Sequence, residues 1–210
     1  MRIVYVLVLV AVAALGAVFF NVMREGPPSL EAARIYDTPR PVSDFRLEST
    51  HGETVTPASL EGQWTFLFTG YTYCPDICPT TMAALKSRWN ELSAATDLPV
   101  KVWMISVDPK RDSLQQLAPY VGFFGKGFVG IRGEHPQLYP FVTSIGMMYS
   151  VPEEHETNYE VAHSAAIVLV NPEGRQHAIF QPINTPGQYT TINPNFVVND
   201  FKKIVQASRY

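Results

Sequence analysis

The fold of this chain is decided by the stretch Trp64-Thr65-Phe66-Leu67-Phe68-Thr69-Gly70-Tyr71-Thr72-Tyr73-Cys74-Pro75-Asp76-Ile77-Cys78-Pro79. Its first five residues form an apolar run that predicts a buried strand, and a helical pattern over residues 80–92 follows the second cysteine. The cysteines are therefore expected at the start of a helix. Free N–H groups and the helix dipole at that place favour thiolate over thiol, so the pair is suited to binding a soft metal or to disulfide exchange.

The composition indicates a folded domain and argues against a nucleic-acid partner. Among the 210 residues, 16 are Lys or Arg and 19 are Asp or Glu, which gives a formal net charge of −3. No block of basic residues stands out, and such blocks are typical of proteins that bind nucleic acid. The chain contains no cysteine besides Cys74 and Cys78, so any chemistry that depends on thiols belongs to this pair.

The amino-terminal segment predicts a membrane anchor. Residues 3–20 carry no charged or strongly polar side chain, which meets the lower length limit for a transmembrane helix. We expect residues 1–23 to be an uncleaved anchor, because a cleaved signal peptide normally has an apolar core of about 7–15 residues. The flanking charges place the amino terminus inside. A single-pass protein of the bacterial inner membrane, with its main domain in the oxidising periplasm, is the simplest interpretation.

A tether and one domain follow the predicted anchor. Residues 24–41 are rich in proline and are predicted to be a linker. Residues 42–210 are predicted to form the domain. The predicted strands cover residues 45–48, 64–69, 100–107, 128–131, 165–170 and 176–180. The predicted helices cover residues 80–92, 113–124, 136–145 and 195–206. This order predicts an α/β fold, a mixed sheet flanked by helices, with its reactive site at the carboxyl ends of strands.

Cys74, Cys78 and His163 are the candidate metal ligands. Residues i and i+4 of a helix share a face, with Cα atoms roughly 6 Å apart, so the two thiols can close a disulfide or converge on one ion. His163 precedes the strand at 165–170. It is a hydrogen-bonded core group, a base that activates a thiol, or a third ligand. Two thiolates and one imidazole suit Cu(I) and are also acceptable to Cu(II), whereas zinc usually needs a fourth ligand.

Several further residues are candidates for supporting roles. Asp76 lies between the cysteines, where it complements the helix dipole or tunes partner docking. Tyr73 and Glu160 are assigned to the surroundings of the ligands or to partner docking. His135 and His155 are candidate accessory copper contacts. The pair Met147-Met148 is interpreted as core filling, and Asp108 and Asp112 as loop and cap residues.

Three motifs in the same order resemble the SCO/SenC family of copper-binding proteins. They are Gly70–Thr80, Ser106–Asp112 and His163-Ser164. The resemblance implies a thioredoxin-like fold, copper held by Cys74, Cys78 and His163, and a role in building the dinuclear copper A centre of cytochrome c oxidase. It also implies a copper-accepting oxidase subunit as partner, together with an upstream copper donor or thiol reductant.

One position departs from the family pattern. The family usually has an aspartate directly before the histidine, and this chain has Ala162. The three ligands are retained, so the departure bears on how the imidazole is oriented or on which partner is recognised.

The leading hypothesis is a membrane-tethered copper chaperone, which is not an enzyme in the strict sense. The alternative is a thiol–disulfide oxidoreductase that reduces the cysteines of a copper-accepting partner, with Cys74 as nucleophile and Cys78 as resolving thiol. The spacing is one residue longer than C-x-x-C, and no proline precedes the strand at 165–170, so metal delivery is favoured. A thiol peroxidase fits less well because a second cysteine follows at once. A structural disulfide leaves His163 unexplained.

Overall fold

The computed structural model describes Tyr5, Gly16 and residues 29–153, 159–182 and 191–208. These residues form an eight-stranded sheet with the order β1-β8-β7-β4-β5-β6-β2-β3. The strands are β1 (Ala33–Pro41), β2 (Leu47–Ser49), β3 (Thr54–Val55), β4 (Trp64–Gly70), β5 (Val100–Ser106), β6 (Phe128–Arg132), β7 (Ile167–Val170) and β8 (Arg175–Phe180). The helices are η1 (Pro57–Leu60), α2 (Ile77–Ser87), α3 (Trp89–Ser93), α4 (Leu114–Gly122), α5 (His135–Ser144) and α6 (Pro194–Ala207).

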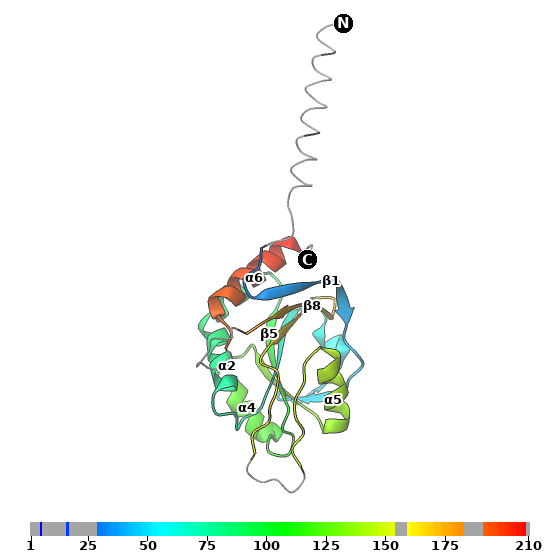
Figure 1. Cartoon of the computed structure of the whole chain (residues 1–210), viewed down its shortest axis with the longest axis vertical. Helices are drawn as coiled ribbons and strands as arrows, with labels where there is room; N and C mark the ends of the chain where they lie inside the picture. The colour runs from blue at the N-terminus through cyan, green and yellow to red at the C-terminus, as the bar shows by residue number, and fades with distance from the viewer. Residues whose placement is uncertain (1–4, 6–15, 17–28, 154–158, 183–190, 209–210) are drawn as a thin grey trace.

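The sheet is mixed and is covered on both faces, as the sequence predicts (Figure 1). Strands β4, β5 and β6 run parallel, whereas β7 pairs antiparallel with β4. All seven residues of β4 are buried, which is typical of a strand with helices on both sides. Phe66 and Phe68 pack into the core beneath α2, α4 and α6, and Leu67 packs into the core beneath α5.

The helix after the cysteine loop begins earlier than predicted and is interrupted. It starts at Ile77 instead of residue 80, so Cys78 lies in its first turn. It breaks at Arg88 into α2 and α3. The predicted cap of the next helix is confirmed, since the Ser113 side chain accepts a hydrogen bond from the Gln116 backbone N–H.

The prediction that residues 24–41 form a linker is wrong over 33–41. This part is strand β1, which pairs with β8 from Ala33 opposite Phe180 to Pro41 opposite Arg175. The prolines of the segment suggested irregular chain. An edge strand tolerates proline, because one side of it needs no ladder hydrogen bonds. A register shift between Ile35 and Arg40 further loosens the pairing at this edge.

The predicted membrane anchor, residues 1–23, lies outside the described residues except for Tyr5 and Gly16. Among the residues that the structure does describe, no helix combines the length and apolarity needed to cross a bilayer. The anchor therefore stays a prediction from sequence.

A buried carboxylate on the last helix holds the chain at the start of β1. Asp200 of α6 is fully buried and accepts hydrogen bonds from the backbone N–H groups of residues 31, 32 and 33 at 2.9, 2.7 and 2.8 Å. Hydrogen bonds to an ionised acceptor are roughly twice as strong as neutral ones. The contact ties the entry of β1 to the last helix, and Figure 1 shows the two side by side.

Replacing Asp200 by asparagine should therefore destabilise the domain. An amide has one acceptor oxygen, and its NH₂ group opposes the backbone donors, so we expect a loss of about 2–4 kcal/mol in the free energy of unfolding. Urea denaturation of the full-length chain measures this value. The exposed neighbour Asn199 supplies the control, since Asn199→Ala should change stability by less than about 0.5 kcal/mol. Equal effects of the two substitutions would contradict the assignment.

Candidate metal centre

The cysteine pair lies where β4 passes into α2. Cys74 is on the connecting loop and is half-buried, whereas Cys78 is in the first helical turn and is buried. Both are free thiols in the structure. Gly70, the last residue of β4, gives Cys78 its space, since a Cβ atom there would lie 3.0 Å from the Cys78 Sγ and 3.2 Å from the Met104 Cε. Glycine is therefore favoured at this position of the motif, because any side chain would crowd Cys78 and Met104.

His163 reaches the cysteines from the segment that leads into the neighbouring strand, β7. It forms an isolated bridge with Tyr149 shortly before β7, and β7 lies next to β4 in the sheet. The His163 Nε2 is 3.5 Å from the Cys78 Sγ. The ligand atoms of Cys74, Cys78 and His163 all lie within 4.8 Å of one another, and no other such group of His, Cys, Asp or Glu is found in the described part of the chain.

The His163 ring is held with its Nε2 toward the sulfurs. Its Nδ1 lies 3.0 Å from the Ser164 carbonyl oxygen and 3.4 Å from the Thr69 hydroxyl. An Nδ1–H that donates to this carbonyl leaves a lone pair on Nε2, which is the form that binds metal. Tyr71 packs edge-on against the imidazole, with ring centres 5.9 Å apart. The sequence did not single out Thr69 or Tyr71, although Tyr71 lies within the quoted motif.

The two thiols differ in their protonation. A hydrogen bond from the Cys78 S–H lowers the pKa of Cys74 to about 4, against the opposing effect of burial, and the Cys78 backbone N–H adds to the lowering. The same hydrogen bond, followed by burial, raises the pKa of Cys78. At neutral pH the pair therefore consists of one thiolate, on the more exposed Cys74, and one buried thiol.

An open pocket lies over the ligands. Its volume is about 470 Å³, and the lining includes Cys74, His163, Asp76 and Glu160. The cysteine loop forms one wall, and the segment 160–163 forms the other. Asp76 occupies the N-cap position of α2, but its side chain makes no capping hydrogen bond. The two carboxylates therefore face an approach path to the ligands from different segments.

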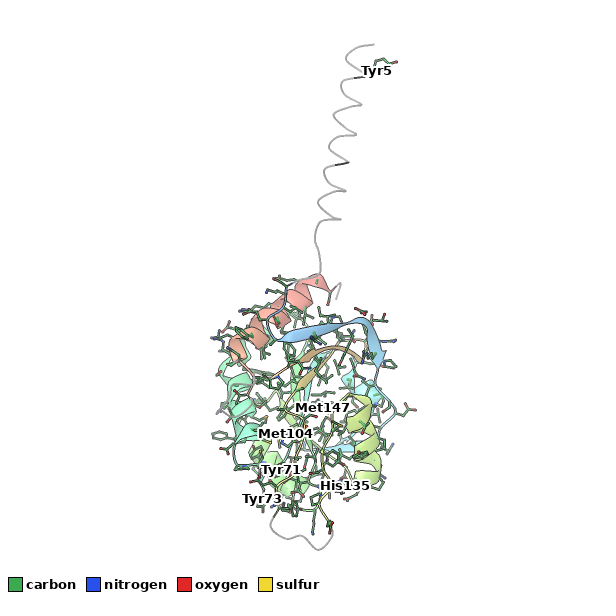
Figure 2. All side chains as sticks on the ribbon, viewed as in Figure 1. Tyr5, Tyr71, Tyr73, Met104, His135 and Met147 are labelled. Carbon is green, nitrogen blue, oxygen red and sulfur yellow. The ribbon has the colours of Figure 1, made fainter. Side chains whose placement is uncertain are left out.

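Tyr73, the third predicted supporting residue, lies beside the pocket and not in its lining. Its side chain is 56% exposed, and its hydroxyl accepts a hydrogen bond from the Gln116 side chain at 3.5 Å. Tyr71 and Tyr73 lie at the end of the molecule away from α6 (Figure 2). The candidate centre is thus remote from the place where β1 begins.

In the described part of the chain, no further histidine joins the group of three ligands. The His135 Nδ1 lies 2.9 Å from the Tyr149 hydroxyl, and His155 falls outside the described residues. Met147 is buried in the core, as predicted. Met148 is 71% exposed, so the core interpretation is wrong for this member of the pair.

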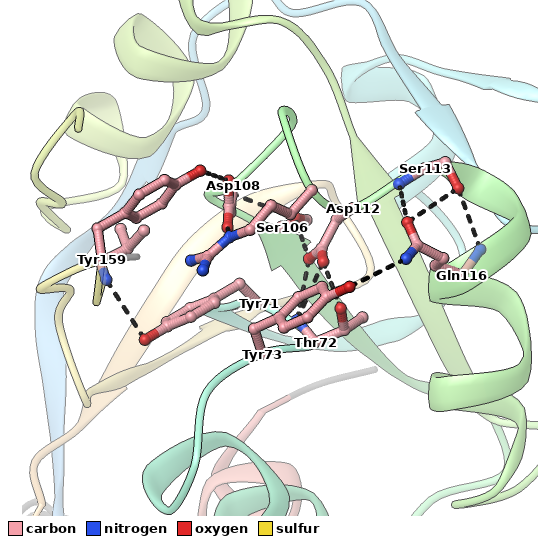
Figure 3. Close-up of polar contacts among 11 residues, drawn as sticks. Tyr71, Thr72, Tyr73, Ser106, Asp108, Asp112, Ser113, Gln116 and Tyr159 are labelled. Carbon is pink, nitrogen blue, oxygen red and sulfur yellow. Dashed lines mark hydrogen bonds and ion pairs between the residues drawn. The ribbon is translucent and has the colours of Figure 1, made fainter. Parts of the chain in front are cut away.

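Asp108 and Asp112 do more than the predicted loop and cap roles. Both are buried. Asp112 accepts hydrogen bonds from the Thr72 backbone N–H at 3.0 Å and from the Ser106 hydroxyl at 2.6 Å, which ties the cysteine loop to the end of β5 (Figure 3). The interpretation from sequence missed this because the partners come from separate segments.

The fold and the site define a thioredoxin-like protein with a candidate metal centre of two cysteines and one histidine. Residues 34–194 match the family model described as SCO1/SenC, and the chain belongs to this family. It is 33% identical to the mitochondrial protein SCO1 homolog 1 of Arabidopsis thaliana. The matched stretch of 151 residues covers 72% of this chain and 43% of that protein. The structure of Arabidopsis thaliana ScoI with copper bound has a TM-score of 0.64 and 30% identity, covering 78% of this chain and 98% of that one.

A more distant structure shares the fold. It is that of BsSco, described as a member of the Sco family of cytochrome c oxidase assembly proteins with a disulfide switch. Its TM-score is 0.59 at 21% identity, over 83% of this chain and 99% of that one. The chain spans between 43% and 66% of the lengths of the curated relatives compared.

The unequal protonation of the thiols predicts an unusual pH profile for alkylation. Because the pKa of Cys74 is lowered to about 4, its thiolate is present at every pH above that value, so its rate of reaction with iodoacetamide should be nearly constant between about pH 6 and pH 8. Cys78 should stay unreacted in the folded protein. Mass spectrometry of the labelled peptides measures both rates.

The control removes the main cause of the shift. In Cys78→Ala the S–H donor is absent, so the pKa of Cys74 should rise and its rate should fall as the pH decreases. A wild-type rate that drops about tenfold per pH unit below pH 8, as for an ordinary thiol, would refute the assignment of the thiolate to Cys74.

Proposed function

We propose that this protein binds copper through Cys74, Cys78 and His163 and delivers it to a copper site in another protein, in the first place the copper A centre of cytochrome c oxidase. The observation that carries the proposal is the convergence of two sulfurs and one imidazole nitrogen within 4.8 Å. This donor set suits Cu(I), because soft thiolates select the soft ion and three ligands satisfy it.

Transfer proceeds by ligand exchange. Cys74 is half-buried and ionised, so it takes the incoming ion first, and the buried Cys78 thiol releases its proton as it binds. The pocket over Cys74 and His163 gives the thiolates of an acceptor access to the bound ion. These thiolates displace the ligands of this chain one at a time. Both cysteines must be reduced for loading, which requires a thiol reductant or a donor that supplies copper before they oxidise.

Thiol–disulfide exchange is the weaker alternative on the same residues. The low pKa of Cys74 suits a nucleophile. The resolving thiol would be Cys78, which is 1% exposed and whose pKa is raised. A protonated, buried thiol attacks a mixed disulfide slowly. In this chemistry the His163 Nε2, 3.5 Å from the Cys78 Sγ, would act as the base that activates the resolving thiol.

The proposed partner contacts surround the pocket. Asp76 and Glu160 line it and supply negative charge, and Tyr73 presents an exposed ring beside it. The proposed location is the bacterial inner membrane, with a single amino-terminal span and the domain in the periplasm. The apolar residues 3–20 support that location.

Copper binding by the reduced full-length chain tests the proposal directly. We expect one copper per chain, with two sulfurs and one imidazole nitrogen seen by X-ray absorption. Cys78→Ser and His163→Ala should each weaken copper binding by more than about 100-fold. Even the loss of a residue that only hydrogen-bonds to a metal ligand lowers metal affinity about 10–100-fold. His51→Ala, which removes a histidine from an exposed turn, is the matched control and should bind as wild type. If the wild-type chain retains no copper and shows rapid disulfide exchange instead, the proposal is refuted.

The partner-docking role predicts an effect on transfer rate without an effect on affinity. Asp76→Asn together with Glu160→Gln should slow copper transfer to a purified copper A domain about two- to tenfold at low salt, because charges at the rim of an interface act mainly on association. Stopped-flow absorbance follows the transfer. Glu173→Gln, at an exposed position in the β7–β8 turn, should leave the rate unchanged. A double variant that transfers copper at the wild-type rate would exclude these carboxylates from docking.

A further inference from the structure

Arg111 lies outside the metal centre, yet it contacts both segments that supply the ligands. It is on the loop between β5 and α4. Its guanidinium carbon is 3.8 Å from the ring centre of Tyr159, 5.0 Å from that of Tyr73 and 5.6 Å from that of Tyr71. Tyr71 and Tyr73 belong to the loop that carries Cys74, and Tyr159 belongs to the segment that leads to His163. One cation therefore bridges the two sides of the centre.

Polar contacts hold the same three segments together (Figure 3). Asp108 is buried, forms an ion pair with Arg111 and accepts a hydrogen bond from the Tyr159 hydroxyl at 2.8 Å. The Tyr71 hydroxyl accepts a hydrogen bond from the Val161 backbone N–H at 3.3 Å. The histidine segment is therefore fastened at Tyr159 and at Val161, and His163 follows two residues later.

The loop that carries Arg111 is itself fixed to the cysteine loop. The buried Asp112, next to Arg111, accepts hydrogen bonds from the backbone N–H of Thr72 at 3.0 Å and from its hydroxyl. Movement of Arg111 relative to Cys74 is therefore restrained. Displacement of the guanidinium would act mainly on the histidine segment, which meets it through the Tyr159 ring.

The contacts suit a guanidinium and not an ammonium. The Arg111 Nη2 is buried and has no hydrogen-bond acceptor among the described residues. Its charge is instead met by Asp108 and by the faces of the tyrosine rings. A planar guanidinium stacks on such rings, each contact being worth about 0.5–2 kcal/mol, and lysine cannot reproduce the plane.

We propose that Arg111 is a positioning residue for the metal centre: it clamps the segment 159–163 against the loop 71–74 and so keeps the His163 Nε2 within reach of both sulfurs. The inference rests on the proposed copper-binding function and adds to it a residue that touches none of the ligands. Without the clamp the two sulfurs keep their mutual contact, since the Cys78 N–H donates to the Cys74 Sγ at 3.4 Å. The histidine segment keeps its backbone hydrogen bonds to residues 148 and 150 but loses its fastening at Tyr159, so the distance from the imidazole to the sulfurs is less well fixed.

The test compares Arg111→Lys with wild type in the full-length reduced chain. We expect copper(I) affinity, measured against a competing chelator, to fall about 10- to 100-fold, as for loss of a partner that orients a ligand. X-ray absorption should show two sulfurs retained and the imidazole nitrogen lost. Without copper, amide hydrogen exchange of residues 159–163 should be faster. Arg88→Lys is the matched control, because Arg88 also pairs with an acidic residue three positions away, Glu91, but lies at the α2–α3 junction.

A wild-type ligand set and unchanged exchange in Arg111→Lys would overturn the inference while leaving copper binding intact. Failure of the wild-type chain to bind copper would instead refute the proposed function, and hydrogen exchange would still decide whether the clamp exists. If Arg111→Lys does not fold, Tyr159→Phe takes its place. That variant removes only the hydroxyl bond to Asp108, and retention of full imidazole coordination in it would count against the clamp.

Discussion

The antiparallel pairing of β4 with β7 is the constraint on which the centre depends. Thr65 lies opposite Val170 and Leu67 opposite Val168, so the carboxyl end of β4 and the amino end of β7 meet at one edge of the sheet. The cysteine loop leaves from the first of these ends, and His163 enters at the second. His163, which is 85 or more positions from either cysteine along the chain, is thereby brought to the cysteine pair by two buried strands. Both β4 and β7 are buried along their whole length.

This arrangement produces a centre whose two sulfurs are not equivalent. The first turn of α2 buries Cys78 against Gly70, whereas Cys74 stays on the loop beside the pocket. The hydrogen bond between the thiols then places the negative charge on Cys74, the less buried of the two. One ionised sulfur gives an incoming ion a first ligand at neutral pH, and the second becomes available only as the metal displaces its proton. In the proposed function, loading is therefore coupled to proton release, and Cys74 offers the more accessible of the two sulfurs to an exchanging partner.

Much of this could be predicted from the sequence, because the signals are local. The apolar run at 64–68, the cysteine spacing and the alternation of strands with helices each lie within a short window. Strand β1 was missed because its prolines are tolerated only at a sheet edge, and edge position is a property of the whole sheet. The role of Arg111 was missed for a related reason, since Tyr159 lies far along the chain and meets it only after folding.

The structure also bears on Ala162, the position at which the resemblance to the SCO/SenC family implies an aspartate. Its backbone is fixed by the neighbouring strand-like segment, since the Ala162 carbonyl accepts from the Ser150 N–H at 2.8 Å and its N–H donates to the Ser150 hydroxyl at 3.0 Å. The orientation of His163 is set by the Ser164 carbonyl and by Tyr71, neither of which involves the side chain at 162. Ala162 is exposed and lines the pocket beside Glu160. The absent carboxylate therefore changes the charge at the rim of the pocket, which in the proposed function is the surface that a partner meets, and the position of the imidazole is maintained by other groups.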